Sequence, residues 1–98
     1  MDKLPHSRAA DVIAKQIIRS GTSSGANYRA ACRAKSTPDM INKMKIVEEE
    51  SDETMYWLEI LAETGITPQE QLQDIYKETN EILAMTVASL KTLRNRKS

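Results

Sequence analysis

The sequence predicts an all-α protein: an antiparallel, up-and-down helical bundle that forms a single domain over residues 1–98. Phe is absent and aromatic residues make up only 4% of the chain, so aliphatic residues and Ala must fill the core. This composition favours helices over strands. Apolar residues recur at helical spacing along three long stretches. Because the turns expected between them are short, successive helices should pack antiparallel.

The first stretch should begin at a helix cap, Ser7, and continue as a helix to about Arg19. Two glycines and several Ser and Thr residues follow over 21–25 and lower the helix propensity there. A helix rich in small residues resumes over 26–34. We expect a kink or a brief interruption at 21–25, and the sequence leaves open whether it is a kink or a turn.

The next two helices carry clearer boundaries. Thr37, followed by Pro and Asp, predicts a helix start with Thr37 as the cap. Gly65 predicts the end of that helix in a left-handed conformation. Thr67, with a Glu three residues later, repeats the start pattern. The last helix has the most regular apolar period, from Leu72 to Leu93.

The net charge of zero conceals strong segregation along the chain. Residues 1–45 carry nine basic and three acidic side chains (+6), residues 46–81 carry one and eleven (−10), and residues 82–98 carry four and none (+4). Antiparallel helices could pair the basic and acidic faces. Alternatively, the basic segments could bind nucleic acid. The candidate phosphate contacts are Arg19, Lys91, Arg94, Arg96 and Lys97.

The sequence predicts no catalytic, cofactor-binding or metal-binding residues, and therefore no enzyme and no small-molecule substrate. The only histidine, His6, lies in an end expected to fray, so a di-metal carboxylate site lacks its ligands. Cys32 has no histidine nearby, so we expect it to be a thiol packed in the core. The 21–25 segment lacks the ending of a phosphate-binding loop.

No apolar run approaches the length of a membrane span, and residues 1–5 do not begin a signal peptide. The single cysteine fits a reducing compartment, and we expect a cytoplasmic protein.

Three groups of residues are candidates for contacts between helices or subunits. Small side chains predict a surface of close approach, made by Gly21, Gly25, Ala26 and Ala30. Charges spaced four apart on successive helices predict a charged seam, made by Arg29, Arg33, Glu49 and Glu53. Large amphipathic aromatic residues suit half-buried interface positions, and these are Tyr28, Tyr56 and Trp57.

Two blocks of the chain resemble a known family. The segments 19–29 (RSGTSSGANYR) and 49–59 (EESDETMYWLE), with 82–91 (ILAMTVASLK), strongly resemble the bacterial four-helix-bundle proteins named after intervening sequences in 23S ribosomal RNA. The resemblance covers about residues 4–95. It implies a four-helix bundle that assembles into a homo-oligomer, with a five-fold ring favoured. Related accessory proteins of diversity-generating retroelements bind nucleic acid and a reverse transcriptase.

The chain departs from that family at two points. Ser24 stands where a bulky aliphatic residue is usual, which is expected to loosen packing. Family members also carry a helix before the position of Leu4, so either Met1 is a late start or the first helix is shortened or missing. We therefore expect a non-enzymatic, self-assembling structural or adaptor module. The alternative is a nucleic-acid-binding accessory protein in a reverse-transcriptase or ribosomal RNA context.

Overall fold

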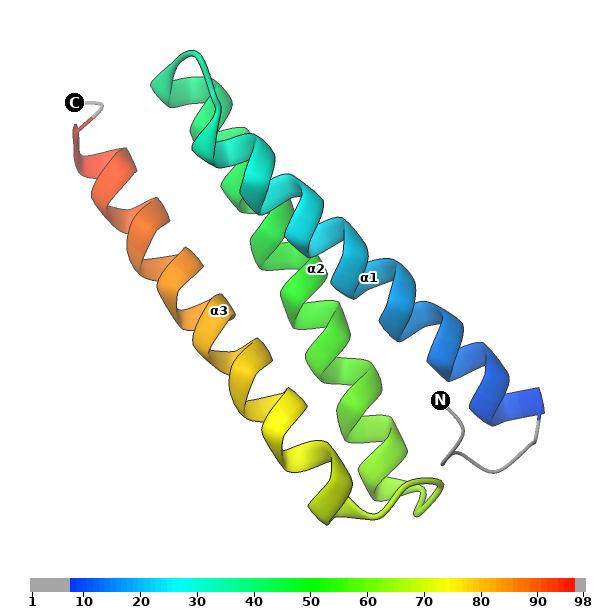
Figure 1. The fold of residues 1–98 in the computed structure, drawn as a ribbon. Helices are drawn as coiled ribbons and strands as arrows, with labels where there is room; N and C mark the ends of the chain where they lie inside the picture. The colour runs from blue at the N-terminus through cyan, green and yellow to red at the C-terminus, as the bar shows by residue number, and fades with distance from the viewer. Residues whose placement is uncertain (1–7, 97–98) are drawn as a thin grey trace.

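The computed structural model describes residues 8–96, which form three long helices (Figure 1). α1 spans Arg8–Cys32, α2 spans Thr37–Glu63 and α3 spans Gln69–Arg96. α1 and α3 run in the same direction, and α2 runs opposite to both. The described range contains no strand, so the all-α prediction is confirmed.

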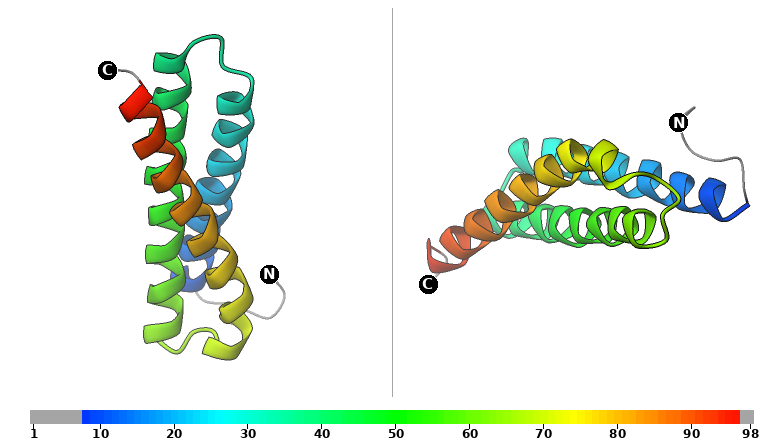
Figure 2. Two further views of the ribbon diagram at one scale, coloured as in Figure 1. Left: turned by 90° about the vertical axis from the view of Figure 1, so that its left-hand side faces the viewer. Right: turned by 90° about the horizontal axis from the view of Figure 1, so that it is seen from below.

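α2 is the central element of the molecule. It packs against both other helices, whereas no Cα atom of α1 lies within 8 Å of a Cα atom of α3. Seen from the end of the bundle, α1 and α3 lie over the same side of α2 along much of their length (Figure 2). A four-helix arrangement with a shortened first helix is not seen in residues 8–96, where the helices have similar lengths of 25, 27 and 28 residues.

The interruption predicted at residues 21–25 is wrong, because α1 continues through it without a break and ends at Cys32. Each glycine inside a helix costs only about 1 kcal/mol relative to alanine. The neighbouring Ser20 and Ser24 are buried against α2, so tertiary packing holds this segment helical. Local propensity is outweighed by these contacts.

The helix boundaries correct two predicted caps and confirm a third. Ser36, rather than Thr37, caps α2, with its hydroxyl accepting from the Asp39 N–H at 3.2 Å. The Thr67 hydroxyl caps nothing: its side chain is buried and makes no hydrogen bond within the described range. Gly65 follows the end of α2 with φ 72°, as predicted. The predicted cap Ser7 and the sole histidine, His6, lie outside the described residues.

Two apolar clusters form the core, one toward each end of the bundle. The first, near the α2–α3 turn, contains Ile13, Leu58, Leu61 and Leu72. The second, near the α1–α2 turn, contains Ala31, Ile41, Met44 and Leu90. Between them lie buried hydroxyl side chains: Ser20, Ser24, Ser51, Thr54 and Thr86. The middle of the molecule is therefore polar and narrow.

Candidate functional site

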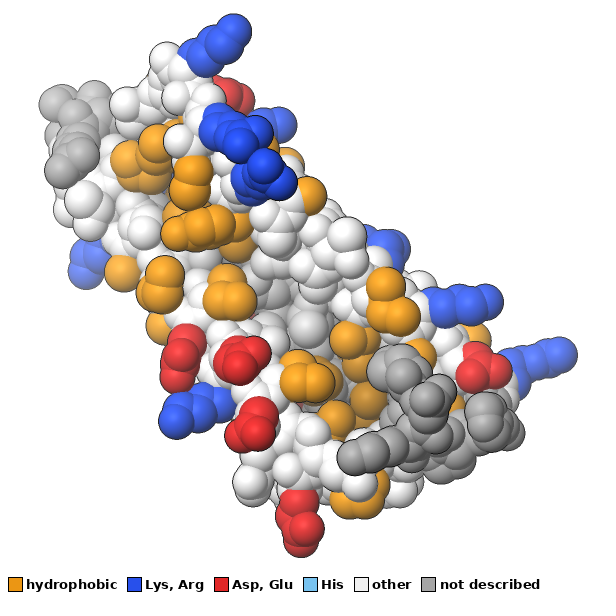
Figure 3. Space-filling model, viewed as in Figure 1, with side chains coloured by type: hydrophobic (Ala, Val, Ile, Leu, Met, Phe, Trp, Pro, Cys, Tyr) orange, Lys and Arg blue, Asp and Glu red, His pale blue; other side chains and the backbone are white. Residues whose placement is uncertain are grey.

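A groove runs between α1 and α3, with α2 as its floor, and it faces the viewer in Figure 3. Two cavities of about 360 and 350 Å³ lie along it and share Tyr28 as a lining residue. No residue that lines either cavity is charged, although charged residues make up 29% of the chain. We call this surface the α1–α3 groove. Its chemistry suits an apolar or hydroxyl-bearing partner surface.

α3 supplies one wall of the groove because it carries two apolar stripes. One stripe faces α2 and includes the buried Leu72 and Leu90. The other is offset toward α1 and includes Ile75, Ile82 and Met85, which are 48%, 43% and 57% exposed. Within the described range this second stripe has no helix packed on it. A helix with two such stripes normally contacts two neighbours.

The sequence carried a signal for this second stripe. The apolar period of the last helix is doubled, with adjacent apolar residues at Ile75/Tyr76 and at Ile82/Leu83. One member of each pair faces α2 and is half-buried, while the other is exposed. Doubled positions at helical spacing therefore mark a helix with two contact faces.

α1 supplies the opposite wall, and this wall is low because it contains glycine. Gly21 and Gly25 line the lower cavity, and a Cβ atom added at either one would meet nothing within 4 Å. Ala26 is exposed and Ala30 is half-buried. In the described chain the close approach of α1 to α2 is made instead by Ser20 and Ser24. A contact of the glycines with another subunit stays a prediction.

Hydroxyl groups form the buried layer under the groove. Ser20 Oγ lies 2.7 Å from Thr54 Oγ1, and Ser24 Oγ lies 2.9 Å from Ser51 Oγ. Thr54 donates to the carbonyl of Glu50, so the Ser20 hydroxyl donates to Thr54. Ser24, which departs from the family's usual aliphatic residue, therefore packs as a hydrogen-bonded member of this layer.

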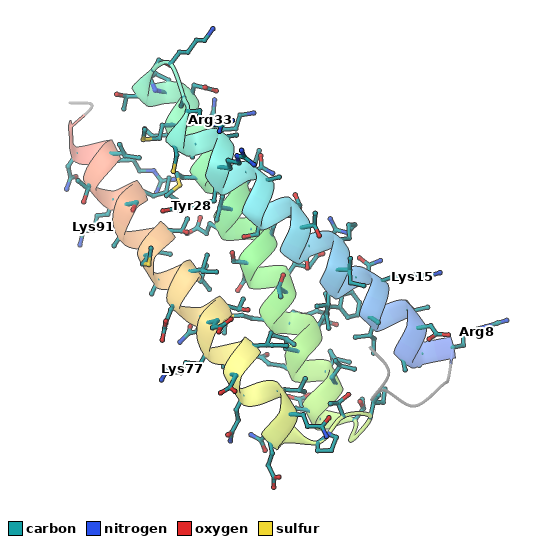
Figure 4. All side chains as sticks on the ribbon, in the orientation of Figure 1. Arg8, Lys15, Tyr28, Arg33, Lys77 and Lys91 are labelled. Atoms are coloured by element: carbon teal, nitrogen blue, oxygen red, sulfur yellow. The ribbon has the colours of Figure 1, made fainter. Side chains whose placement is uncertain are left out.

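The three predicted interface aromatics occupy different places. Tyr28 is 41% exposed and lies over the groove (Figure 4). Tyr56 is 53% exposed and meets the Trp57 ring edge-on, with the centroids 5.0 Å apart. Trp57 is half-buried against the core cluster of Leu58, and its buried Nε1 has no hydrogen-bond partner in the described range. Of the three, only Tyr28 lines the groove.

The charged seam is made by a different arginine from those predicted. Arg19 pairs with Glu50 at 3.3 Å and also with Glu53. Arg29 and Arg33 are exposed and form no ion pair in the described range.

The register of α1 on α2 explains the difference. Ser20 lies opposite Thr54 and Ser24 lies opposite Ser51. Arg29 therefore falls near position 46, seven residues or about 10 Å along the axis from Glu53. The sequence gave the spacing within each helix but not this register.

Charge is polarised along the bundle. Because α1 and α3 end where α2 begins, basic residues from all three helices gather at that end. Arg33 and Lys91 both lie there in Figure 4. Arg94 is exposed near the same end, while the Arg96 side chain and Lys97 lie outside the described residues. Acidic residues of α2 and α3 gather toward the other end.

Cys32 corrects another prediction, since it is exposed and lines the groove instead of packing in the core. It sits at the last residue of α1, where the helix ends above the floor formed by α2. Residues 8–96 hold no group of three or more metal-binding side chains. No helix in this range is long and apolar enough to cross a membrane.

A third cavity, of about 360 Å³, lies between α2 and α3 and differs from the groove in carrying carboxylates, those of Glu59 and Glu63. Tyr76 donates a hydrogen bond to Glu59 Oε1 at 3.0 Å across its rim. That hydrogen bond raises the pKa of Tyr76 above its ordinary value, and desolvation and the charge of Glu59 act in the same direction. A single carboxylate–phenol pair on an open surface joins two helices and does not form a reaction centre.

Comparisons with known proteins agree with this architecture. The family model described as 23S rRNA-intervening sequence protein matches residues 1–88. A crystal structure of a protein of unknown function from Bacteroides thetaiotaomicron, assigned to the S23 ribosomal protein family, is 45% identical. It superposes with a TM-score of 0.78 over 82% of this chain and 74% of its own. Curated proteins yield no match.

Proposed function

The chain belongs to the family of 23S rRNA-intervening sequence proteins, and on that premise we propose that it is a non-enzymatic, self-assembling module with a structural or adaptor role. The observation that carries this proposal is the uncharged α1–α3 groove, flanked by large apolar side chains that water contacts. Exposed apolar surface of this extent is typical of protein contact sites. A homo-oligomer would cover it, and the family resemblance favours five subunits.

The same residues argue for a role without catalysis. The groove contains no charged or titratable cluster that could supply an acid, a base or a nucleophile with its partner. Its one reactive group is the Cys32 thiol, and no histidine lies in the described range. The single cysteine of the chain also supports a cytoplasmic location.

Native mass spectrometry of untagged protein, purified gently, tests the proposal. We expect a bare homo-oligomer as the dominant species. A protein that stays at its monomer mass of 11.0 kDa at every concentration would refute self-assembly.

A second candidate function is nucleic-acid binding, and the observation that favours it is the basic end of the bundle. Arg29, Arg33, Lys91 and Arg94 reach this end from two helices, outside the uncharged groove. Binding through several phosphates should weaken steeply as salt increases. Nucleic acid that comigrates with the oligomer at low salt and is lost at moderate salt would favour this candidate.

A further inference from the structure

We propose that the α1–α3 groove is the docking site for a second copy of this chain, with the α1 wall of one copy lying against the α3 wall of its neighbour. The inference rests on the proposed self-assembly and specifies which surfaces meet. It is carried by three properties of the groove: shape, charge and area.

The two walls of the groove are complementary in shape. The α3 wall projects the half-exposed side chains of Ile82 and Met85. The α1 wall is recessed at Gly21 and Gly25, where no atom lies within 4 Å of an added Cβ. Each molecule thus carries a ridge and the recess that would receive it, as self-association requires.

The ridge and the recess also lie at the same height along the bundle. Gly21, Gly25, Ile82 and Met85 line one cavity, and α1 and α3 run in the same direction. Rotation about an axis parallel to the helices preserves height. It therefore brings Met85 of one copy opposite Gly25 of the next. Repeating this contact closes a dimer or a ring.

Charge favours this arrangement over the packing of two like walls. α1 carries four basic and one acidic residue, a net +3 over Arg8–Cys32. The first half of α3, residues 69–83, carries one basic and four acidic residues, a net −3. Placing α1 beside α3 of a neighbour at equal height sets opposite charges along the rim, whereas α1 beside α1 would set like charges together. The uncharged lining argues against a phosphate backbone in the groove itself.

The exposed area is large enough for such a contact. The chain exposes 6756 Å², whereas a compact protein of 11.0 kDa exposes about 5,600 Å². A subunit in a standard interface buries about 800 Å². The uncovered groove contributes to the excess because α1 and α3 do not cover each other.

Cysteine crosslinking tests which walls meet. In a Cys32→Ser background, Gly25→Cys and Met85→Cys are made in separate, differently tagged chains, so that each copy carries one thiol. Mixed under mild oxidation, the two should yield the crosslinked heterodimer as the main product. Val87→Cys, an exposed position outside the cavities, is the matched control and should give no crosslink with Gly25→Cys.

A second variant fills the recess. Gly25→Leu adds bulk where the described chain leaves space, so helix content and cooperative unfolding should persist while the mass shifts from oligomer to monomer. Ala26→Leu, at an exposed neighbour that lines neither cavity, should leave the mass unchanged. Loss of the oligomer in Gly25→Leu alone, together with the Gly25–Met85 crosslink, supports the docking site.

The two proposals fail in different ways. An unmodified protein that is oligomeric, gives no Gly25–Met85 crosslink and keeps its mass with Gly25→Leu would overturn the docking site and leave self-assembly standing. An unmodified protein that is monomeric throughout would overturn both. A different protein found in the groove, protecting the Gly25→Cys thiol from alkylation, would also overturn docking of a second copy.

Discussion

Hydroxyl pairs in the middle of the bundle fix how α1 lies on α2. The Ser20–Thr54 and Ser24–Ser51 hydrogen bonds connect residues that are buried on both helices. A shift of either helix by one turn would bury these hydroxyls without partners, at a cost of about 1–3 kcal/mol for each group. Small polar side chains thus set the register where apolar packing alone would tolerate sliding.

Removing one partner of a pair should therefore cost more than removing both. We expect Ser51→Ala to lower the free energy of unfolding by about 1–2 kcal/mol, because Ser24 Oγ is left buried without its partner. The double variant Ser24→Ala/Ser51→Ala should lose less than the sum of the two single variants. Urea unfolding measures all three, with the exposed Thr22→Ala as the control. Strict additivity would argue against the pair.

The ion pairs of Arg19 should contribute little to stability. The Arg19 and Glu53 side chains are 48% and 40% exposed, so water screens their attraction. Arg19→Ala should lower the free energy of unfolding by less than about 1 kcal/mol, and by less still at high salt.

A double-mutant cycle identifies the partner of Glu53. Coupling should appear between Arg19→Ala and Glu53→Ala and be absent between Arg29→Ala and Glu53→Ala. Coupling of Arg29 instead would contradict the register described above.

At the level of single helices, the ends follow from local chemistry more closely than the middle of α1 does. α2 begins after Ser36, whose φ of −150° and ψ of 161° place its hydroxyl under the Asp39 N–H. It ends with Gly65 at φ 72°, a conformation that costs other residues about 1–2 kcal/mol. Both ends use groups within four residues of the boundary.

The cap assignment can be checked by paired substitutions. Ser36→Ala should lower the free energy of unfolding by about 1 kcal/mol, because the Asp39 N–H loses its acceptor. Thr37→Ala, the cap expected from sequence, should change it by only a few tenths of that amount. Denaturant midpoints compared at equal m-value distinguish them, and a larger effect at Thr37 would refute the observed cap.

At the scale of the whole molecule, three helices leave one face of the bundle uncovered. α2 is covered from two directions, whereas α1 and α3 each expose a stripe toward the groove. Burial of such surface stabilises by about 25 cal/mol per Å². Assembly would therefore raise the stability of a domain whose two core clusters are separated by a polar layer.

Thermal unfolding should consequently depend on protein concentration. We expect Tm to rise with concentration for the unmodified protein, because assembly stabilises only the folded chain. Gly25→Leu should abolish this dependence while leaving a cooperative transition, and Ala26→Leu should retain it. Scanning calorimetry over a range of concentrations makes the measurement. A Tm independent of concentration in the unmodified protein would contradict assembly under those conditions.

The sequence by itself determined the helices and their approximate ends. The apolar period from Leu72 to Leu93 and the glycine at 65 required only contacts within one helix or turn, which short-range chemistry specifies. The doubled positions at Ile75/Tyr76 and Ile82/Leu83 even carried the second face of α3.

Only the tertiary structure decided the continuity of α1, the partner of Glu53 and the exposure of Cys32. Each depends on how one helix is placed against another. Residues 21–25 stay helical because Ser20 and Ser24 bond to α2, and Glu53 meets Arg19 because those same bonds set the register. Such long-range contacts can outweigh local propensities of about 1 kcal/mol per residue, and for that reason spacing along one helix could not reveal them.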